Sequence, residues 1–228
     1  WNDKGAKQTF EWQEGSLISL PLNVWHQHFN GQGNEPARFF SVNNMPIVFN
    51  LFHSPDFIFN VPYDFTDRFN GDPDYFSGKG KSHPGRVWET NFVADARNFK
   101  LEEWKERGAS GSNVMLEMAD GTMAAHISEF PIGTYKKAHR HGPGFNVIII
   151  KGKGFSIFWK EGQPIKRYEW QDGSVFVPPE MWFHQHFNTG ATPARYLPPR
   201  FGGIKFSMGE GVGDITKVDK DVKQGGNQ

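Results

Sequence analysis

Short apolar runs separated by turn residues dominate the second half of the chain. They are NVMLEMA (113–119), FNVIII (145–150) and FSIFW (155–159), and each is followed by a stretch rich in Gly with Asp, Lys or Glu. Runs of this length at regular spacing are typical of strands in an all-β barrel or jelly roll. The spacing alone fits a β-sandwich without an internal site equally well.

One segment of the chain occurs twice, which indicates that a structural unit is repeated. EWQEGSLISLPLNVWHQHFN (11–30) and EWQDGSVFVPPEMWFHQHFN (169–188) are identical at 11 of 20 positions, at a constant offset of 158 residues. After a slip of one residue, Pro-Ala-Arg at 36–38 matches the same tripeptide at 193–195. We therefore expect tandem β-barrel domains, of which the second, residues 110–208, is complete.

The first unit is expected to be incomplete at its N-terminus. Trp1 aligns with Trp159, in the middle of the second unit, so residues 1–40 match only the C-terminal half of a barrel. Half a barrel would leave long strand edges without partners. We expect a missing N-terminal segment of the same protein to complete it.

The remaining segments are expected to be less regular. Residues 41–109, rich in Phe, Asp, Pro and Gly, should form an aromatic-anchored connection between the domains, because so many Phe side chains need burial. Within it, ARNFKLEEWKER (96–107) favours a short helix, with Glu103 and Arg107 one turn apart and Gly108 as a stop. The polar, Gly-rich tail 209–228 is expected to fray.

Composition and charge narrow the function classes. The chain has 15% aromatic residues, enough for a sizeable core, and a formal net charge of zero, which argues against nucleic acid or an anionic membrane as partner. No apolar run reaches the roughly 18 residues of a membrane span, and no signal peptide is recognisable, so we expect a cytoplasmic protein. Without Cys, any metal must bind to His, carboxylate or amide groups.

Three histidines have the spacing of a metal site. His139 and His141 precede an apolar strand, and residues two apart in a strand point to the same face. His184, after Pro178-Pro179, would come from the opposite wall. Imidazole suits Fe(II), Mn, Zn, Cu and Ni, and three protein ligands with open positions are typical of a catalytic site. We expect one divalent metal in the second barrel.

Further residues are weaker candidates. His186 lies on the same face as His184 and is expected to act as general acid or base, to bind substrate or to orient a ligand by a hydrogen bond. His26 and His28 mirror this pair and mark a candidate site in the first barrel. Lys137 and Arg200 are candidate anion contacts, and Trp182 would line an apolar pocket or pack in the core. His126 is expected to be structural.

These motifs resemble the cupin superfamily. Its first motif has Gly, five residues, His-x-His, usually Glu and a later Gly; its second has Pro, His five residues on and Asn four after that. The matching residues are Gly133, His139, His141 and Gly152 for the first motif, Pro179, His184 and Asn188 for the second, and Pro21, His26 and Asn30 for the second motif of the first unit. The resemblance implies a two-barrel cupin, or bicupin.

One departure from the motif narrows the resemblance. Phe145 or Asn146 stands where the Glu ligand is usual, and Asn146 is a candidate fourth ligand or pocket residue. A three-His site with His-Arg-His and a Pro-Pro followed by a Trp-rich His-x-His resembles the gentisate 1,2-dioxygenase-like bicupins. This implies Fe(II) and O2-dependent cleavage of a small hydroxylated aromatic or oxo acid, with an anionic substrate.

Two other function classes stay open. The same scaffold would suit a Mn-, Zn- or Ni-dependent decarboxylase, lyase or isomerase. A non-catalytic ligand-binding or storage cupin is the other, although clustered imidazoles are not needed for packing alone. Paired barrels commonly associate, so we also expect a homo-oligomer.

Overall fold

The two longest strands in the described part of the chain pair with each other. β6 (Ser112–Met118) and β7 (Met123–Phe130) pair antiparallel along their length, joined by a tight turn in which Gly121 has φ +79°. Glycine adopts this left-handed conformation without the cost that a Cβ would bring. The computed structural model describes residues 7–104, 111–142 and 145–201.

This pair is the centre of the larger of the two sheets that form the second unit. Its strand order within the described residues is β11-β8-β13-β7-β6-β3-β2, with β14 also beside β7 and β5 also beside β6. All neighbours are antiparallel except β3 and β6. The strands not yet bounded are β2 (Lys81–His83), β3 (Val87–Glu89), β5 (Glu102–Glu103), β8 (Val147–Lys151), β11 (Val175–Phe176), β13 (Ala194–Leu197) and β14 (Arg200–Phe201).

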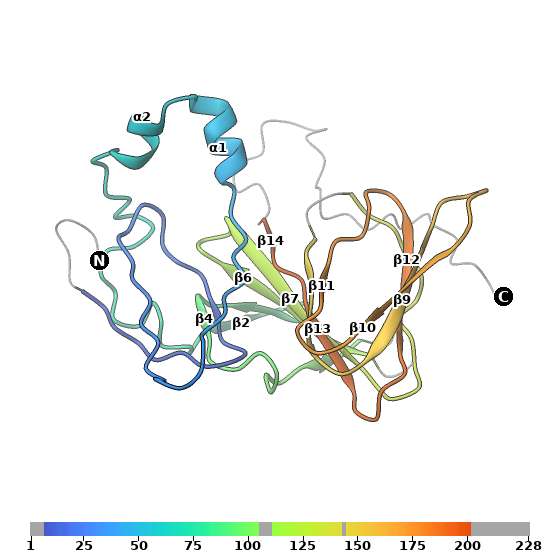
Figure 1. The fold of residues 1–228 in the computed structure, drawn as a ribbon. Helices are drawn as coiled ribbons and strands as arrows, with labels where there is room; N and C mark the ends of the chain where they lie inside the picture. The colour runs from blue at the N-terminus through green and yellow to red at the C-terminus, as the bar shows by residue number, and fades with distance from the viewer. Residues whose placement is uncertain (1–6, 105–110, 143–144, 202–228) are drawn as a thin grey trace.

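A smaller sheet faces the larger one. It consists of β10 (Lys166–Trp170), β9 (Gly154–Trp159) and β12 (Phe183–Asn188), in that order, all antiparallel. Gly154 allows the close approach of β12 and β10, because a Cβ at this position would collide with the carbonyl of Phe187 and the ring of Trp170. Figure 1 shows β9 and β12 at the right, across from β11 and β13 of the larger sheet.

A core of mainly apolar side chains fills the space between the two sheets. Phe130, Val147, Ile149, Trp170, Ala194 and Tyr196 form a buried cluster that draws on both sheets. Alternation along each strand sets which side chains enter it: on β7, His126 and Phe130 face inward, whereas Ile127 faces away. The described residues of this region therefore form two facing β-sheets with a shared core, and the complete second barrel over residues 110–208 stays a prediction.

The opposite face of the large sheet carries a second core. Val114, Leu116 and Met118 of β6, Ala125 and Ile127 of β7 and Leu197 of β13 pack there against Val93 and Ala96. The last two residues belong to segment 41–109. β3 and β5 from the same segment pair with β6, so this predicted connection also adds strands to the barrel wall.

The N-terminal part has little regular secondary structure in its described residues. β1 (Leu17–Ile18) pairs with β4 (Phe92–Val93), and two short helices follow, α1 (Met45–Phe52) and α2 (Pro55–Phe59). Ser54 caps α2, because its hydroxyl accepts a hydrogen bond from the Phe57 amide 3.3 Å away. Figure 1 shows these elements to the left of the barrel.

The helix predicted within 96–107 is wrong for its described part. Residues 102–103 form β5, which pairs with Ser112 and Asn113 of β6, and the preceding residues form a turn. Pairing with a long neighbouring strand therefore outweighs the local preference for a helix. Residues 105–107 of this segment and the tail 209–228 lie outside the described residues.

The chain is mostly β, but two barrels in tandem are not seen. Residues 7–40 contain one two-residue strand, so the first cupin barrel and the domain boundaries at 40 and 109 stay predictions. None of the helices in the described part of the chain is long and apolar enough to cross a bilayer.

Candidate metal centre

Two neighbouring stretches of backbone bring the three predicted histidines together. His139 and His184 form a bridge in which each backbone amide donates to the other's carbonyl, at 3.1 and 2.8 Å. The Met181 amide donates to the His141 carbonyl at 3.0 Å and continues the pairing. The backbone therefore sets His139 and His141 directly beside the start of β12.

The three imidazoles converge on one point. Their candidate ligand atoms all lie within 4.8 Å of one another. The ring centroids of His139 and His184 are 4.3 Å apart, and those of His141 and His184 are 4.8 Å apart. Metal–nitrogen bonds of about 2.1 Å place ligand nitrogens roughly 3–3.5 Å apart, so small side-chain rotations would complete coordination. The predicted three-His cluster is confirmed.

Backbone carbonyls fix the orientation of each ring. His139 Nδ1 lies 3.1 Å from the carbonyl oxygen of Lys137. His141 Nδ1 lies 2.8 Å from the carbonyl oxygen of Gly142, and His184 Nδ1 lies 3.2 Å from that of Trp182. A carbonyl only accepts hydrogen bonds, so Nδ1 must carry the proton and Nε2 the lone pair. This tautomer is the one that presents Nε2 to a metal.

The cluster has a neutral donor set. No carboxylate joins the three histidines among the residues that the structure describes. His184 is buried at 2% exposure, whereas His139 and His141 are half-buried. An ion held here would keep its full positive charge.

Phe145 stands beside the cluster. Its ring centroid is 4.3 Å from that of His141. Asn146 instead lines a surface hollow of about 230 Å³ together with Phe201 and residues of segment 40–46. Of the two residues that the sequence left open, Phe145 therefore occupies the position next to the ligands, and Asn146 borders the neighbouring hollow.

His186 is buried deeper in the barrel, outside the three-His cluster. Its Nδ1 lies 2.7 Å from the Ser156 hydroxyl, and the indole of Trp170 donates to the same hydroxyl at 2.9 Å. Its ring centroid is 5.5 Å from those of His184 and Tyr196. This position is close enough to the cluster to orient His184, and the catalytic role of His186 stays a prediction.

Arg200, Trp182 and Lys137, which the sequence marked as candidate substrate contacts, have different surroundings in the structure. The Arg200 guanidinium lies over the Phe145 ring, 5.3 Å from its centroid, so it borders the site. The Trp182 ring lies beneath the ammonium groups of Lys160 and Lys166, and its carbonyl holds His184. Lys137 contributes its carbonyl to His139, and its side chain is half-buried.

The histidines of the first unit do not form a comparable site. His26 and His28 are exposed, with ring centroids 5.8 Å apart, and no third ligand joins them among the described residues. A metal site in the first barrel stays a prediction.

Sequence reasoning missed the groups that surround the histidines. Tyr196 contacts both His186 and His126, and Ser156 links His186 to Trp170. The only available signal was strand alternation, which assigns inward positions without saying which of them meet.

Comparisons with known proteins give weak likenesses. No protein-family model matches the chain, and no curated protein matches it. The Schizosaccharomyces pombe Cnp3 cupin domain has a TM-score of 0.39 and 16% identity, covering 48% of this chain and 73% of that one.

Two enzymes are similar to a comparable degree. Bacillus subtilis oxalate decarboxylase, described with Mn(II) centres, has a TM-score of 0.40 and 18% identity, covering 53% of this chain and 32% of that one. The polyketide cyclase RemF from Streptomyces resistomycificus has a TM-score of 0.40 and 13% identity, covering 48% and 78%. Cupin-like structures thus match about half of the chain, and the chemistry must be argued from the histidines.

Proposed function

We propose that the chain is a metal-dependent enzyme of the cupin type that holds one divalent ion on His139, His141 and His184. The observation that carries this proposal is the common orientation of the three rings, each with Nδ1 on a backbone carbonyl. Carbonyl hydrogen bonds of this kind set the tautomer and raise the basicity of metal-binding histidines. A packing role alone gives no reason for three such rings to meet.

We propose Fe(II) as the metal. The reaction that we propose is O2-dependent cleavage of a small hydroxylated aromatic or oxo acid. A bound divalent ion supplies Lewis acidity, and Fe(II) also supplies the redox chemistry that O2 requires. Three neutral ligands leave such an ion at 2+, which favours an anionic substrate that binds through two oxygens. The sequence resemblance to gentisate 1,2-dioxygenase-like bicupins supports the same choice.

The side chains beside the cluster have defined parts in this proposal. Arg200 would hold an anionic group of the substrate, because its guanidinium is positioned on Phe145 next to the ligands. Phe145 replaces a negatively charged ligand by an apolar ring, which keeps the donor set neutral and offers a flat surface to an aromatic substrate.

Metal removal tests the proposal. Protein loaded with Fe(II) should contain about one ion per chain by elemental analysis and should consume O2 when given gentisate, catechol or salicylate. A chelator should abolish O2 uptake, Fe(II) should restore it, and His139→Ala should lose both the ion and the activity. His83→Gln, on β2, is the matched control and should change neither.

The opposite results identify the other function classes. Turnover without O2, or with Mn, Zn or Ni but not Fe(II), would replace the dioxygenase by a decarboxylase, lyase or isomerase. A chain that binds no ion with its fold intact would leave only a ligand-binding or storage role.

A further inference from the structure

A histidine that the sequence marked as structural lies on the inner face of the large sheet. Alternation along β7 places His126 on the same side as Phe130. The His126 ring lies 6.3 Å from the Phe145 ring and 5.8 Å from the Tyr196 ring, measured between centroids. Phe145 in turn contacts the metal-ligand candidate His141, at 4.3 Å. Through Phe145, His126 is therefore connected to the three-His cluster.

Arg200 lies on the same wall as His126. On β14 it is opposite Ala124 of β7 in the antiparallel register, and Ala124 and His126 point to the same face because they are two residues apart. Diagonal neighbours of this kind are roughly 7–8 Å apart, within reach of long side chains. The Arg200 guanidinium lies 5.3 Å from the centroid of the Phe145 ring. Arg200 and His126 thus both approach Phe145 from the large sheet.

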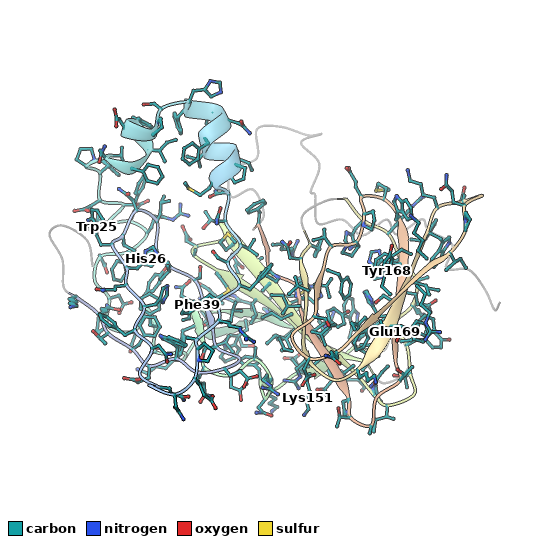
Figure 2. The ribbon with its side chains drawn as sticks, in the orientation of Figure 1. Trp25, His26, Phe39, Lys151, Tyr168 and Glu169 are labelled. Carbon is teal, nitrogen blue, oxygen red and sulfur yellow. The ribbon has the colours of Figure 1, made fainter. Side chains whose placement is uncertain are left out.

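The three-His cluster approaches from the other sheet. His184 belongs to β12 of the small sheet, and backbone hydrogen bonds set His139 beside it. Figure 2 labels Lys151 at the end of β8 in the large sheet and Tyr168 on β10 of the small sheet, and it shows side chains in the space between them. Facing sheets stand about 10 Å apart, a gap that one six-membered ring with polar groups at both ends can bridge.

We propose that Arg200 and His126 bind a carboxylate of the substrate while two phenolic oxygens of the same molecule bind the ion. A guanidinium donates paired hydrogen bonds to a carboxylate, and an imidazole N–H donates another. Both side chains are half-buried, as are Phe145 and His141, so part of each remains accessible to a small molecule. The inference rests on the proposed function and names its substrate class, a catechol with its acid group on the far side of the ring.

This arrangement separates two ways in which an aromatic acid can bind. In salicylate and gentisate, the carboxylate and the neighbouring hydroxyl form the chelating pair, which leaves no acid group for Arg200 and His126. In 3,4-dihydroxybenzoate, the two hydroxyls chelate and the carboxylate points away from them. Phe145 lies between the cluster and the large-sheet pair, where it would pack against the substrate ring.

Binding to the metal-free protein tests the Arg200–His126 pair by itself. The probe is 4-fluorobenzoate, which has the carboxylate but no chelating oxygens, and its fluorine NMR signal measures Kd. His126→Phe and Arg200→Gln should each raise this Kd by about tenfold or more, because each removes a hydrogen bond to a charged group. His83→Phe, at a half-buried position on β2, is the matched control and should leave Kd unchanged. Unfolding midpoints of the variants check that they fold.

The Fe(II)-loaded protein tests selectivity. The value of kcat/KM for O2 uptake should be about tenfold or more higher with 3,4-dihydroxybenzoate than with catechol, mainly through a lower KM. His126→Phe and Arg200→Gln should each bring this ratio close to one, whereas His83→Phe should keep the ratio of the parent chain.

The outcomes distinguish this inference from the proposed function. Equal 4-fluorobenzoate binding in the parent chain and both variants, or no binding, would overturn the inference, and so would a preference for gentisate or salicylate. O2 uptake that requires the ion would leave the proposed function standing in each of these cases. Conversely, 4-fluorobenzoate binding that both substitutions weaken, in a protein that consumes no O2 with any of these acids, would support the carboxylate site and refute the dioxygenase.

Discussion

Tyr75 is an ionisable side chain whose surroundings alter its chemistry. Its ring lies edge-on against Phe69 and Phe76, with centroids 5.0 and 4.8 Å away. Burial raises the pKa of Tyr75 to about 12. The charge of the nearby Arg68 lowers this pKa, whereas the charge of Asp120 raises it further. The phenol is therefore held neutral by its environment.

This shift predicts a dependence of stability on alkaline pH. An unfolded tyrosine has a pKa of about 10, so between pH 10 and 12 the unfolded chain releases the proton first. The stabilising contribution is full below about pH 10 and is lost as the pH rises through about 12. Urea unfolding across this range should show the loss, and Tyr75→Phe should reduce its slope. Tyr63→Phe, at an exposed position, is the control, and an equal effect there would contradict the explanation.

At the scale of elements, one buried hydroxyl connects side chains from all three strands of the small sheet. Ser156 on β9, which is fully buried, joins Trp170 on β10 to His186 on β12. An indole N–H can only donate, so the serine oxygen accepts from Trp170 and its own proton is available to His186 Nδ1. The bond would then leave His186 with its proton on Nε2.

Removal of this hydroxyl should weaken the fold without emptying the metal centre. Ser156→Ala leaves the buried indole N–H of Trp170 without its acceptor, which costs about 1–3 kcal/mol of unfolding free energy. The backbone carbonyls that orient the three ligands are untouched, so metal content should stay the same. Denaturant unfolding and elemental analysis measure the two effects. The exposed Ser82→Ala should change neither, and metal loss in Ser156→Ala would mean that Ser156 also supports the ligands.

At the scale of elements, the sequence predicted some strands and the three-His cluster but not every strand. The apolar runs predicted β6, β8 and β9, and the His-x-His spacing predicted that residues 139, 141 and 184 converge. Alternation was sufficient for the strands, because a strand has only two faces. His139 and His141 lie outside the named strands, and the isolated bridge from His139 to His184 brings them beside β12. The helix over 96–107 failed because β5 gains its stability from β6, a partner that no local pattern reveals. The hydrogen bonds from the three histidine rings to backbone carbonyls could not be predicted either, because they depend on where the folded backbone places those carbonyls.

At the scale of the whole molecule, the large sheet has a core on each face. Arg195 of β13 links this sheet to the N-terminal part: its guanidinium pairs with Glu129 of β7 at 2.8 Å and donates to the carbonyls of Ala96 and Phe99 at 3.0 and 2.9 Å. Its counterpart in the repeat, Arg38, is exposed. The repeated Pro-Ala-Arg therefore has a buried structural arginine in one copy only.

This difference offers a matched pair of variants. Arg195→Met should lower the unfolding free energy by about 3 kcal/mol, because it leaves Glu129 without its buried partner and two carbonyls without a donor. Arg38→Met should stay within about 0.5 kcal/mol of the parent. Guanidinium-induced unfolding of both variants measures the contrast. Equal losses would mean that Arg38 has a buried role as well.

The alternation along β7 ties the chemistry of the barrel to its attachment to the rest of the chain. His126 and Ile127 are adjacent, yet the first lies beside Tyr196 within the barrel and the second packs with Val93 and Ala96 on the other side. Insertion or deletion of a single residue in this strand would exchange the two faces, bringing an imidazole into the outer core and an aliphatic chain near the histidines. Length changes in β7 should therefore be far less tolerated than substitutions.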